Sequence, residues 1–348
     1  MNMKNLKKYI IIISVLLVCF GIEQLMFNKF YSNAKNKDTI SEYHVDSIKK
    51  YASIDRLTVK NEEEPVILFA SDYQGDYRYD VINYLFTFAK NYVKPNLFVV
   101  CGDYRVSLNE NYIESEYGIL ELGNTFNAYF KGVPIVFIQG NHDLPNTYGI
   151  VQKQYFNTNK YIIYNINRDS FPNNQDVEKD SEKVVKETSK KLEQFLEVQV
   201  KSKNKKPIFI ATHVPLHYSD RNDGEDNKYA QYLFDVINKY SKDLDIVYLF
   251  GHQHSGTYDD YLGGSVNYVA KGKTIKVGGT NKEEIINFTY MNAGYIGFSN
   301  NTNTESSTND LTLSAIKVKD DSLEIQRYTF DRVYYDEPII VERINKAS

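Results

Sequence analysis

The sequence predicts an α/β fold in which two mixed β-sheets pack as a sandwich flanked by helices, preceded by an N-terminal transmembrane helix. Three observations lead to this prediction. An apolar run lies at the N-terminus, strand-like runs alternate with helical periods from Pro65 to Tyr240, and strand-like runs without long helices follow to Phe330. A chain of 348 residues is long enough for one large domain or two smaller ones.

The first 30 residues predict a membrane-targeting segment. Lys4, Lys7 and Lys8 precede the largely apolar stretch Tyr9–Phe27, which approaches the ~20 residues that a helix needs to span a bilayer. Because flanking lysines stay in the cytoplasm, we expect a single-pass signal anchor in the cell membrane, with the catalytic part of the chain outside the cytoplasm. A signal peptide cleaved near Ser32–Ala34, which would release a secreted protein, is the alternative. A buried N-terminal helix would leave the lysines unexplained.

Composition divides the rest of the chain into a stalk, one domain and a tail. Residues 31–64 are rich in Asn, Lys, Ser and Glu and predict a polar stalk. Residues 65–337 predict a single domain, and residues 338–348 are expected to form a C-terminal tail. The chain has only two cysteines, Cys19 and Cys101, so a disulfide framework is excluded.

The spacing of apolar residues predicts each strand and helix of the domain. Before residue 251, short apolar runs predict strands at Val66–Ala70, Leu97–Cys101, Ile135–Ile138, Ile208–Ala211 and Ile246–Phe250. Apolar residues at helical spacing predict helices around 81–89, Glu116–Phe130, Glu182–Val200 and Tyr229–Tyr240. Beyond residue 250, further strands are predicted at Thr274–Val277, Ile285–Tyr290, Tyr295–Phe298, Leu311–Val318 and Leu323–Phe330.

Polar residues with chemistry-bearing side chains follow five of these strands. The about 30 residues between Asp72 and Asp103 fit one βαβ unit, which returns both residues to the same edge of a sheet. Ligands of open α/β sheets bind at this edge, at the carboxyl ends of the strands. Each motif alone is an ordinary turn sequence, but five at strand ends predict one site. Its members are Asp72, Asp103, Asn141, His142, Asp143, His213, His252 and His254.

These motifs resemble those of the calcineurin-like metallophosphoesterase superfamily over nearly all of the chain after the stalk. The family pattern is Asp-x-His, Gly-Asp, Gly-Asn-His-Asp/Glu, a later His and Gly-His-x-His. This chain has Asp72, Gly102-Asp103, Gly140–Asp143, His213 and Gly251–His254. The resemblance implies a hydrolase that cleaves a phosphomonoester or phosphodiester with a hydroxide bridging two divalent metal ions.

The resemblance also implies a role for each residue. Asp103 is expected to bridge the two ions, with Asp72 and His254 completing one site and Asn141, His213 and His252 completing the other. His142 is the implied catalytic residue, because its imidazolium would face the substrate and stabilise the phosphoryl group or protonate the leaving oxygen. Asp143 either orients His142 or caps a turn. His217 is expected to line the pocket wall or lie on the surface.

Gln74 departs from the family pattern, because it stands where the family has a histidine ligand. An amide oxygen is a harder ligand than imidazole, so Gln74 as a metal ligand would favour Mn²⁺ or Mg²⁺ over Zn²⁺. We therefore expect two divalent ions, Mn²⁺ first, with Mg²⁺, Fe and Zn²⁺ as alternatives. Gln74 also supports a second hypothesis, a catalytically silent module of the same fold that binds a phosphorylated envelope component or a partner protein. The intact Asn141-His142 pair and the two late histidines, His252 and His254, oppose it.

The expected partners follow from charge and from the resemblance. A phosphate-ester substrate is implied, and the N-terminal helix would contact the membrane. No nucleic acid is expected, because the net charge is −4 and no long basic block occurs after the N-terminal segment. The loops at 104–115, 144–159 and 217–226 are expected to wall the pocket and set specificity. The sequence identifies no protein partner.

Overall fold

A computed structural model describes residues 62–73, 79–104, 113–143, 155–167, 170–171, 181–218, 228–254, 266–280, 282–297, 311–329 and 333–345. The expected anchor (1–30), nearly all of the expected stalk (31–64) and Gln74 lie outside these residues. Among the helices in the described ranges, none is both long enough and apolar enough to cross a membrane. The anchor and the stalk therefore stay predictions.

Two six-stranded sheets form the framework of the described part of the chain. The first sheet contains, in spatial order, β14 (Ile339–Glu342), β13 (Ser322–Tyr328), β12 (Leu313–Val318), β1 (Val66–Ala70), β2 (Leu97–Val100) and β3 (Ile135–Phe137). The second contains β4 (Tyr155–Asn157), β5 (Ile162–Ile166), β6 (Ile208–Thr212), β7 (Ile246–Phe250), β11 (Thr289–Asn292) and β8 (Tyr268–Val269). A separate hairpin joins β9 (Thr274–Lys276) to β10 (Glu283–Ile285).

Both sheets are mixed, as predicted. In the first, β1, β2 and β3 are parallel, whereas β12, β13 and β14 are antiparallel to their neighbours. In the second, β5, β6, β7 and β11 are parallel, and β4 and β8 are antiparallel edge strands. The parallel strands are buried on both faces, which explains why each reads as a continuous apolar run in the sequence.

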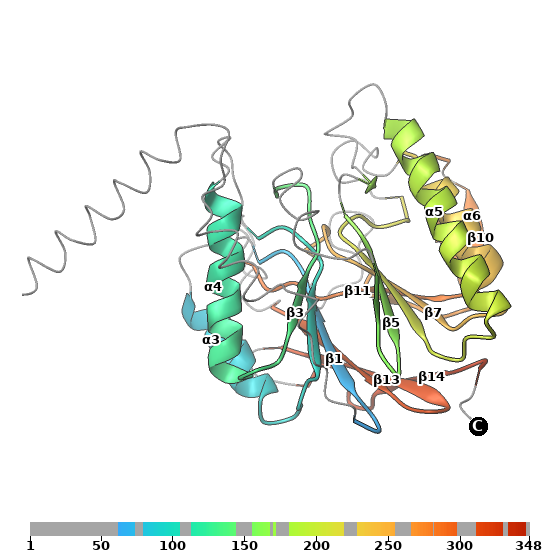
Figure 1. The fold of residues 1–348 in the computed structure, drawn as a ribbon. Coiled ribbons are helices and arrows are strands. Elements are labelled where there is room, and N and C mark those ends of the chain that lie inside the picture. Colours follow the sequence, from blue (N-terminus) through green and yellow to red (C-terminus); the bar gives the residue numbers. More distant parts are fainter. Residues whose placement is uncertain are drawn as a thin grey trace, which may run out of the picture. The chain divides into compact units, whose positions relative to one another are not determined.

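The two sheets face each other and carry helices on their outer faces (Figure 1). Helices α3 (Tyr79–Ala89) and α4 (Ile113–Tyr129) cover the first sheet, and α5 (Ser181–Lys201) and α6 (Ala230–Tyr240) cover the second. Strand β1 shows the alternation that produces these layers. Leu68 belongs to the core under the first helix pair, whereas Ile67 and Phe69 belong to the core between the sheets. The predicted helix-flanked sandwich is confirmed.

Helix α5 forms where the sequence places apolar residues on one helical face. Val185, Leu192 and Leu196 are buried at spacings of seven and four residues. Glu182 lies in the first turn and Lys201 in the last, where each complements the helix dipole. The opposite face is charged, so the helix lies between its sheet and solvent.

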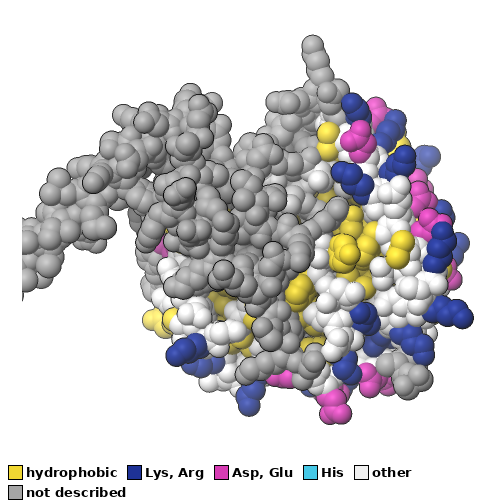
Figure 2. Space-filling view, viewed as in Figure 1, with side chains coloured by type: hydrophobic (Ala, Val, Ile, Leu, Met, Phe, Trp, Pro, Cys, Tyr) yellow, Lys and Arg dark blue, Asp and Glu magenta, His cyan; other side chains and the backbone are white. Residues whose placement is uncertain are grey.

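Charged side chains of both signs are interspersed on the surface of the second helix pair (Figure 2). Along α5, Nζ of Lys186 lies 2.8 Å from Oε1 of Glu182, and Nζ of Lys201 lies 2.7 Å from Oε1 of Glu197. This mixture agrees with the small net charge of the chain.

The expected C-terminal tail at 338–348 is wrong in part. Residues Ile339–Glu342 form β14, which pairs with β13 and extends the first sheet. The main-chain N–H groups of Ile344 and Asn345 donate to the carboxylate of Asp245 at 2.6 and 3.2 Å. The domain therefore reaches at least Asn345. Strand β14 has only four residues, and as an edge strand it exposes every second one. Its apolar residues were therefore too few to predict a strand.

Other strands also differ from the prediction. Strands β4 and β8 were not predicted, and the predicted strand Ile285–Tyr290 is divided between β10 and β11. Strand β5 was not predicted, although Ile162–Ile166 is buried along its whole length. The predicted strand at Tyr295–Phe298 is reduced, within the described residues, to a single bridge between Tyr295 and Ser71. That bridge joins the residues that follow β1 and β11, in the two different sheets. It therefore holds together two of the loops that form the site described below.

Candidate metal centre

Four of the predicted site residues adopt a left-handed backbone conformation. Their φ angles are 56° for Asp72, 57° for Asp103, 71° for His252 and 49° for His254. Non-glycine residues in sparsely populated regions cost of order 1–3 kcal/mol each and collect at functional sites, where the surrounding structure holds them. These residues lie two to four positions beyond the ends of β1, β2 and β7. The fold therefore holds these loops against an intrinsic preference.

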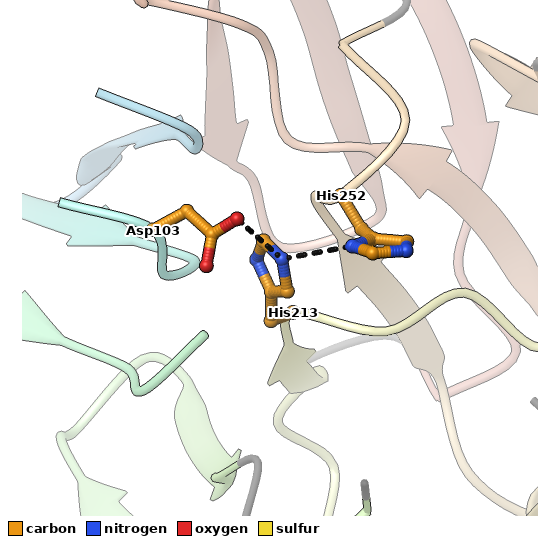
Figure 3. A group of neighbouring side chains, drawn as sticks. All are labelled: Asp103, His213 and His252. Carbon is orange, nitrogen blue, oxygen red and sulfur yellow. Dashed lines mark hydrogen bonds and ion pairs between the residues drawn. The ribbon is translucent and has the colours of Figure 1, made fainter. Parts of the chain in front are cut away.

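Asp103 lies at the centre of a buried cluster of imidazoles. Its Oδ2 is 3.2 Å from Nε2 of His213, which in turn is 3.2 Å from Nδ1 of His252 (Figure 3). Nδ1 of His213 lies 2.7 Å from the carbonyl oxygen of Cys101, to which it donates. This bond fixes the ring, so its other nitrogen faces Asp103.

Asn141 completes the first group of donor atoms. Its Oδ1 lies 2.9 Å from Nε2 of His213 and 2.9 Å from Nδ1 of His252. A carboxylate, an amide oxygen and two imidazole nitrogens thus converge from four loops. The structure brings Asp103, Asn141, His213 and His252 together.

A second group contains Asp72, Asp103 and His254. One donor atom from each residue of this group lies within 4.8 Å of the others, and the same holds for Asp103, His213 and His252. Asp103 is the residue shared by the two groups. Since carboxylate and imidazole are common metal ligands, this geometry fits two adjacent cations with Asp103 between them.

The carboxylate of Asp72 gives an independent test of this fit. Its Oδ2 accepts the main-chain N–H of His252 at 2.9 Å. Its buried Oδ1 lies 3.1 Å from Nε2 of His254 but has no hydrogen bond of acceptable geometry to the described residues. A buried carboxylate oxygen without a hydrogen bond is costly, and a cation would satisfy it. Asp72 therefore fits a metal ligand.

Electrostatics also favour a cation at this position. Burial alone would raise the pKa of Asp103, but His213 and His142 outweigh it and hold that pKa well below its usual range. Burial alone would lower the pKa of His213, but Asp103 and Asp72 outweigh it and raise the pKa to about 9. The cluster thus attracts positive charge, which the proton of His213 supplies without metal.

Gly140 allows the loop after β3 to reach Asp103. A Cβ atom at this position would lie 2.2 Å from Oδ1 of Asp103 and 2.4 Å from its backbone nitrogen. No side chain fits at such distances, so only glycine permits this approach. The Gly-Asn-His-Asp motif therefore begins with glycine for a steric reason.

Asp143 joins two loops of the site through backbone hydrogen bonds. Its Oδ2 accepts from the N–H groups of Asp103 at 2.9 Å and Gly140 at 2.7 Å, and its Oδ1 accepts from Tyr104 at 3.0 Å. Burial and the charge of Asp103 nevertheless raise the pKa of Asp143 to about 7. These contacts match the turn-capping role rather than the alternative of orienting His142.

His142 lies at the partly exposed edge of the cluster. Its main-chain N–H donates to Oδ1 of Asp103 at 2.9 Å, and its ring Nε2 lies 3.9 Å from Oδ2 of the same residue. The side chain is 31% exposed, whereas that of His213 is fully buried. His142 thus lies next to Asp103 and is still accessible to a substrate from solvent.

Two aromatic residues that the motifs did not indicate contact this region. The ring of Tyr295 stacks on that of His254, with centroids 4.8 Å apart and planes 11° apart. Tyr290 hydrogen-bonds His217, which is buried and not on the surface. In the sequence, the one signal for these two tyrosines is their position in or just after a late apolar strand, β11. Most of the loops expected to wall the pocket lie outside the described residues.

Comparison with known families agrees with this geometry. A model described as calcineurin-like phosphoesterase matches residues 65–256. The chain belongs to this family. The match begins at Pro65, where the domain was expected to begin, and it includes both donor groups, from Asp72 to His254. Members of the calcineurin-like phosphoesterase family bind two divalent metals, and this chain has the ligand groups to hold them.

Solved structures share the fold of this calcineurin-like phosphoesterase at low identity. A dimetal phosphatase from Danio rerio aligns with a TM-score of 0.53 and 10% identity over 80% of this chain and 99% of that chain. GAP50, the anchor in the inner membrane complex of Plasmodium, aligns with a TM-score of 0.50 and 14% identity over 82% and 90%. At these identities the likeness concerns the fold alone. No curated protein shows a significant match to this sequence.

Proposed function

We propose that this protein is a metal-dependent phosphoesterase that hydrolyses a phosphomonoester or a phosphodiester. The observation that carries the proposal is the position of Asp103 in both donor groups. Two divalent ions about 3.5–4 Å apart repel each other, and an anionic oxygen between them offsets this repulsion. Asp103 is buried next to His213 and is the one residue common to the two groups.

Each ion would have its own set of ligands beside Asp103. Asp72 and His254 would hold the first, together with Gln74 by its place in the sequence. The second would be held by Asn141, His213 and His252. When bound, the two ions supply an activated water as nucleophile and positive charge for the phosphoryl oxygens. The oxygen-rich first set favours Mn²⁺, with Mg²⁺, Fe or Zn²⁺ as alternatives.

His142 would act on the substrate. Its ring lies on the partly exposed side of Asp103, within 3.9 Å of Oδ2, so a phosphate ester near the two ions would meet it. An imidazolium there would stabilise the phosphoryl group or donate a proton to the leaving oxygen.

A single assay tests the proposed activity. The full-length protein is incubated with p-nitrophenyl phosphate and with bis-p-nitrophenyl phosphate, with Mn²⁺, Mg²⁺ or Zn²⁺ added after chelation. Turnover that requires metal supports the proposal, and the ratio of the two rates separates monoesterase from diesterase. Asp103→Asn serves as the control, because it keeps the shape of the side chain but removes the charge between the groups.

The second candidate is a catalytically silent module that binds a phosphorylated envelope component or a partner protein. GAP50 favours this candidate, because a protein described as an anchor shares the fold. Folded, metal-loaded protein that hydrolyses neither ester would support it. The donor groups of the chain argue for the enzyme, because an anchor has no need of both.

The location of the domain is a separate proposal. Lys4, Lys7 and Lys8 before the apolar stretch Tyr9–Phe27 support a single-pass anchor with the domain outside the cytoplasm. Protease added to intact cells should remove the domain while leaving a cytoplasmic marker uncut. Protection of the domain until the membrane is permeabilised would contradict this orientation, and release into the medium would support a cleaved signal peptide.

A further inference from the structure

Gln253 stands between the two histidines of the Gly251–His254 loop, and its side chain is directed into a buried hydrogen-bond network. Its Nε2 lies 2.6 Å from Nε2 of His217, and its Oε1 accepts the main-chain N–H of Val266 at 3.3 Å. Gln253 and His217 are each only 3% exposed. The side chain of Gln253 is thus held by His217 and Val266, which are not among the donor residues.

The network continues from His217 to Tyr290. Nδ1 of His217 lies 2.7 Å from the hydroxyl of Tyr290, so both ring nitrogens of His217 are hydrogen-bonded. The same hydroxyl accepts the main-chain N–H groups of Leu216 at 2.8 Å and His217 at 3.2 Å. Tyr290 is fully buried in β11 and stacks on Phe250 at the end of β7, with ring centroids 4.6 Å apart. The network therefore links the loop to the rigid core of the second sheet.

The loop needs such support because its backbone is strained. His252 and His254, on either side of Gln253, have φ angles of 71° and 49°. Residues of this kind relax unless their surroundings hold them. The Gly251 N–H donates to the carbonyl of His213 at 2.9 Å, which fixes the start of the loop. In the middle of the loop, the N–H of His252 donates to Oδ2 of Asp72 at 2.9 Å and the N–H of Gln253 donates to the carbonyl of Gly251 at 2.9 Å. The side chain of Gln253 adds a contact from this part of the loop to the core of the second sheet.

We propose that Gln253 and His217 are positioning residues that hold His252 and His254 in the geometry required for metal binding. The proposal rests on the proposed function, because it assumes that these histidines bind metal. Hydrogen-bond partners behind metal ligands typically change metal affinity by 10–100-fold when removed. Here the effect would pass through the backbone of the loop, since Gln253 is directly bonded to both histidines.

Calorimetric titration with Mn²⁺ tests the proposal, using full-length protein from which metal has been removed with a chelator. Gln253→Met removes the hydrogen bonds and keeps a side chain of similar length, and Gln253→Asn is a second variant that is too short to reach His217. Each should weaken Mn²⁺ binding by on the order of 10–100-fold. The double variant Gln253→Met/His217→Leu should bind no more weakly than the weaker single variant, because both residues act through one contact.

Tyr248→Phe provides the matched control. Tyr248 is as deeply buried as Tyr290 and stacks on it, but its hydroxyl donates to the carbonyl of Val214 instead of joining the network. Tyr290→Phe should weaken Mn²⁺ binding, whereas Tyr248→Phe should not, even if both lower the melting temperature. This comparison separates a positioning role from a general loss of stability.

Each outcome decides the matter. Wild-type Mn²⁺ affinity in the folded Gln253 variants would overturn the positioning role while leaving the metal site intact. If the wild-type protein itself binds no Mn²⁺, Mg²⁺ or Zn²⁺, the proposed function fails and the positioning role fails with it. Unfolding of both Gln253 variants under conditions where Tyr248→Phe stays folded would show a purely structural role and would also overturn the proposal.

Discussion

The main-chain N–H of His252 donates to Oδ2 of Asp72 at 2.9 Å, although the two residues are 180 positions apart in the chain. This bond joins the loop after β1 in one sheet to the loop after β7 in the other. It also fixes the carboxylate so that Oδ1 is directed towards Nε2 of His254, 3.1 Å away. The candidate metal centre is thus assembled by contacts between the two sheets, and neither sheet contains all of its donor residues.

Substitution of Asp72 and of Asp103 should reduce the number of bound metal ions by different amounts. Because Asp103 belongs to both donor groups, Asp103→Asn should lose both ions, whereas Asp72→Asn should lose only the ion held with His254. Metal bound after dialysis, measured by inductively coupled plasma mass spectrometry, checks this difference. Equal metal content in the two variants would contradict the shared position of Asp103. Far-ultraviolet circular dichroism establishes that both variants are folded.

His142→Ala should lower turnover by on the order of 10²–10⁴-fold without changing metal content, because the ring acts on the substrate and not on the ions. The substitution keeps the main-chain N–H that donates to Oδ1 of Asp103. Rates are measured with p-nitrophenyl phosphate at saturating Mn²⁺. A rate equal to that of the wild type would remove His142 from the chemistry, and lost metal would show that its ring helps to hold the ions.

The metal-free protein should lose stability as pH rises from about 6.5 to about 9. His213 has a pKa of 6.5 in the unfolded chain and about 9 in the folded protein, so its contribution is complete below 6.5 and is lost through 9. The raised pKa of Asp143, about 7 against 3.8, acts in the same direction at lower pH. Melting temperatures in chelator across this range check the prediction. A melting temperature that rises from pH 7 to pH 9 would contradict it.

Metal binding should show the opposite dependence. An ion must displace the proton that Asp103 and Asp72 hold on His213, so Mn²⁺ affinity should increase as pH rises towards 9. Calorimetry in buffers of different ionisation enthalpy would detect the released proton. His213→Asn should abolish the release, and a release that persists in this variant would place the proton on another group.

The donor residues could be predicted because each lies within four residues of the end of a buried strand. A strand that is covered on both faces is apolar throughout, so the polar residue at its end is conspicuous in the sequence. This is how Asp72 after β1 and His213 after β6 were found. The parallel order of β1 and β2 then follows from the helix between them.

The supporting residues could not be predicted, because their roles depend on contacts between distant segments. His217 resembles any histidine near the surface until β11 places Tyr290 beside it. Tyr295 stacks on His254 only because a single bridge to Ser71 brings β11 to the end of β1. Strand β14 was missed since its exposed edge leaves half of its residues in solvent. Such pairings have no local signal in the chain.

Gly140→Ala should disable the metal centre by steric overlap. The added Cβ would lie 2.2 Å from Oδ1 of Asp103, so either the loop or the carboxylate must move. We expect a loss of roughly 1–3 kcal/mol in the free energy of unfolding and a strong loss of Mn²⁺ binding. At Gly132 an added Cβ meets nothing within 4 Å, although φ is 77°. Gly132→Ala should therefore lower the melting temperature without affecting Mn²⁺ binding, and equal Mn²⁺ affinities in the two variants would contradict the steric argument.

Arg343 connects the C-terminal segment to both sheets at the side opposite the metal centre. Its Nε lies 3.5 Å from Oδ2 of Asp245, at the start of β7, and both side chains are almost completely buried. Its guanidinium also donates to the carbonyl oxygens of Asp320, at 3.0 Å, and Lys205. The strand β14 and its neighbours are therefore tied to the second sheet by one buried arginine.

Arg343→Met should lower the free energy of unfolding by roughly 3–5 kcal/mol, because it leaves a buried carboxylate without its cation. Urea denaturation of the full-length protein measures this. The exposed pair of Lys160 and Asp320, 3.2 Å apart, is the control, and Lys160→Met should cost only about 0–1 kcal/mol. Mn²⁺ affinity should stay unchanged in both variants, since neither contact touches the donor groups. A cost for Arg343→Met as small as that for Lys160→Met would show that residues beyond 337 contribute little to the domain, as a separate tail would.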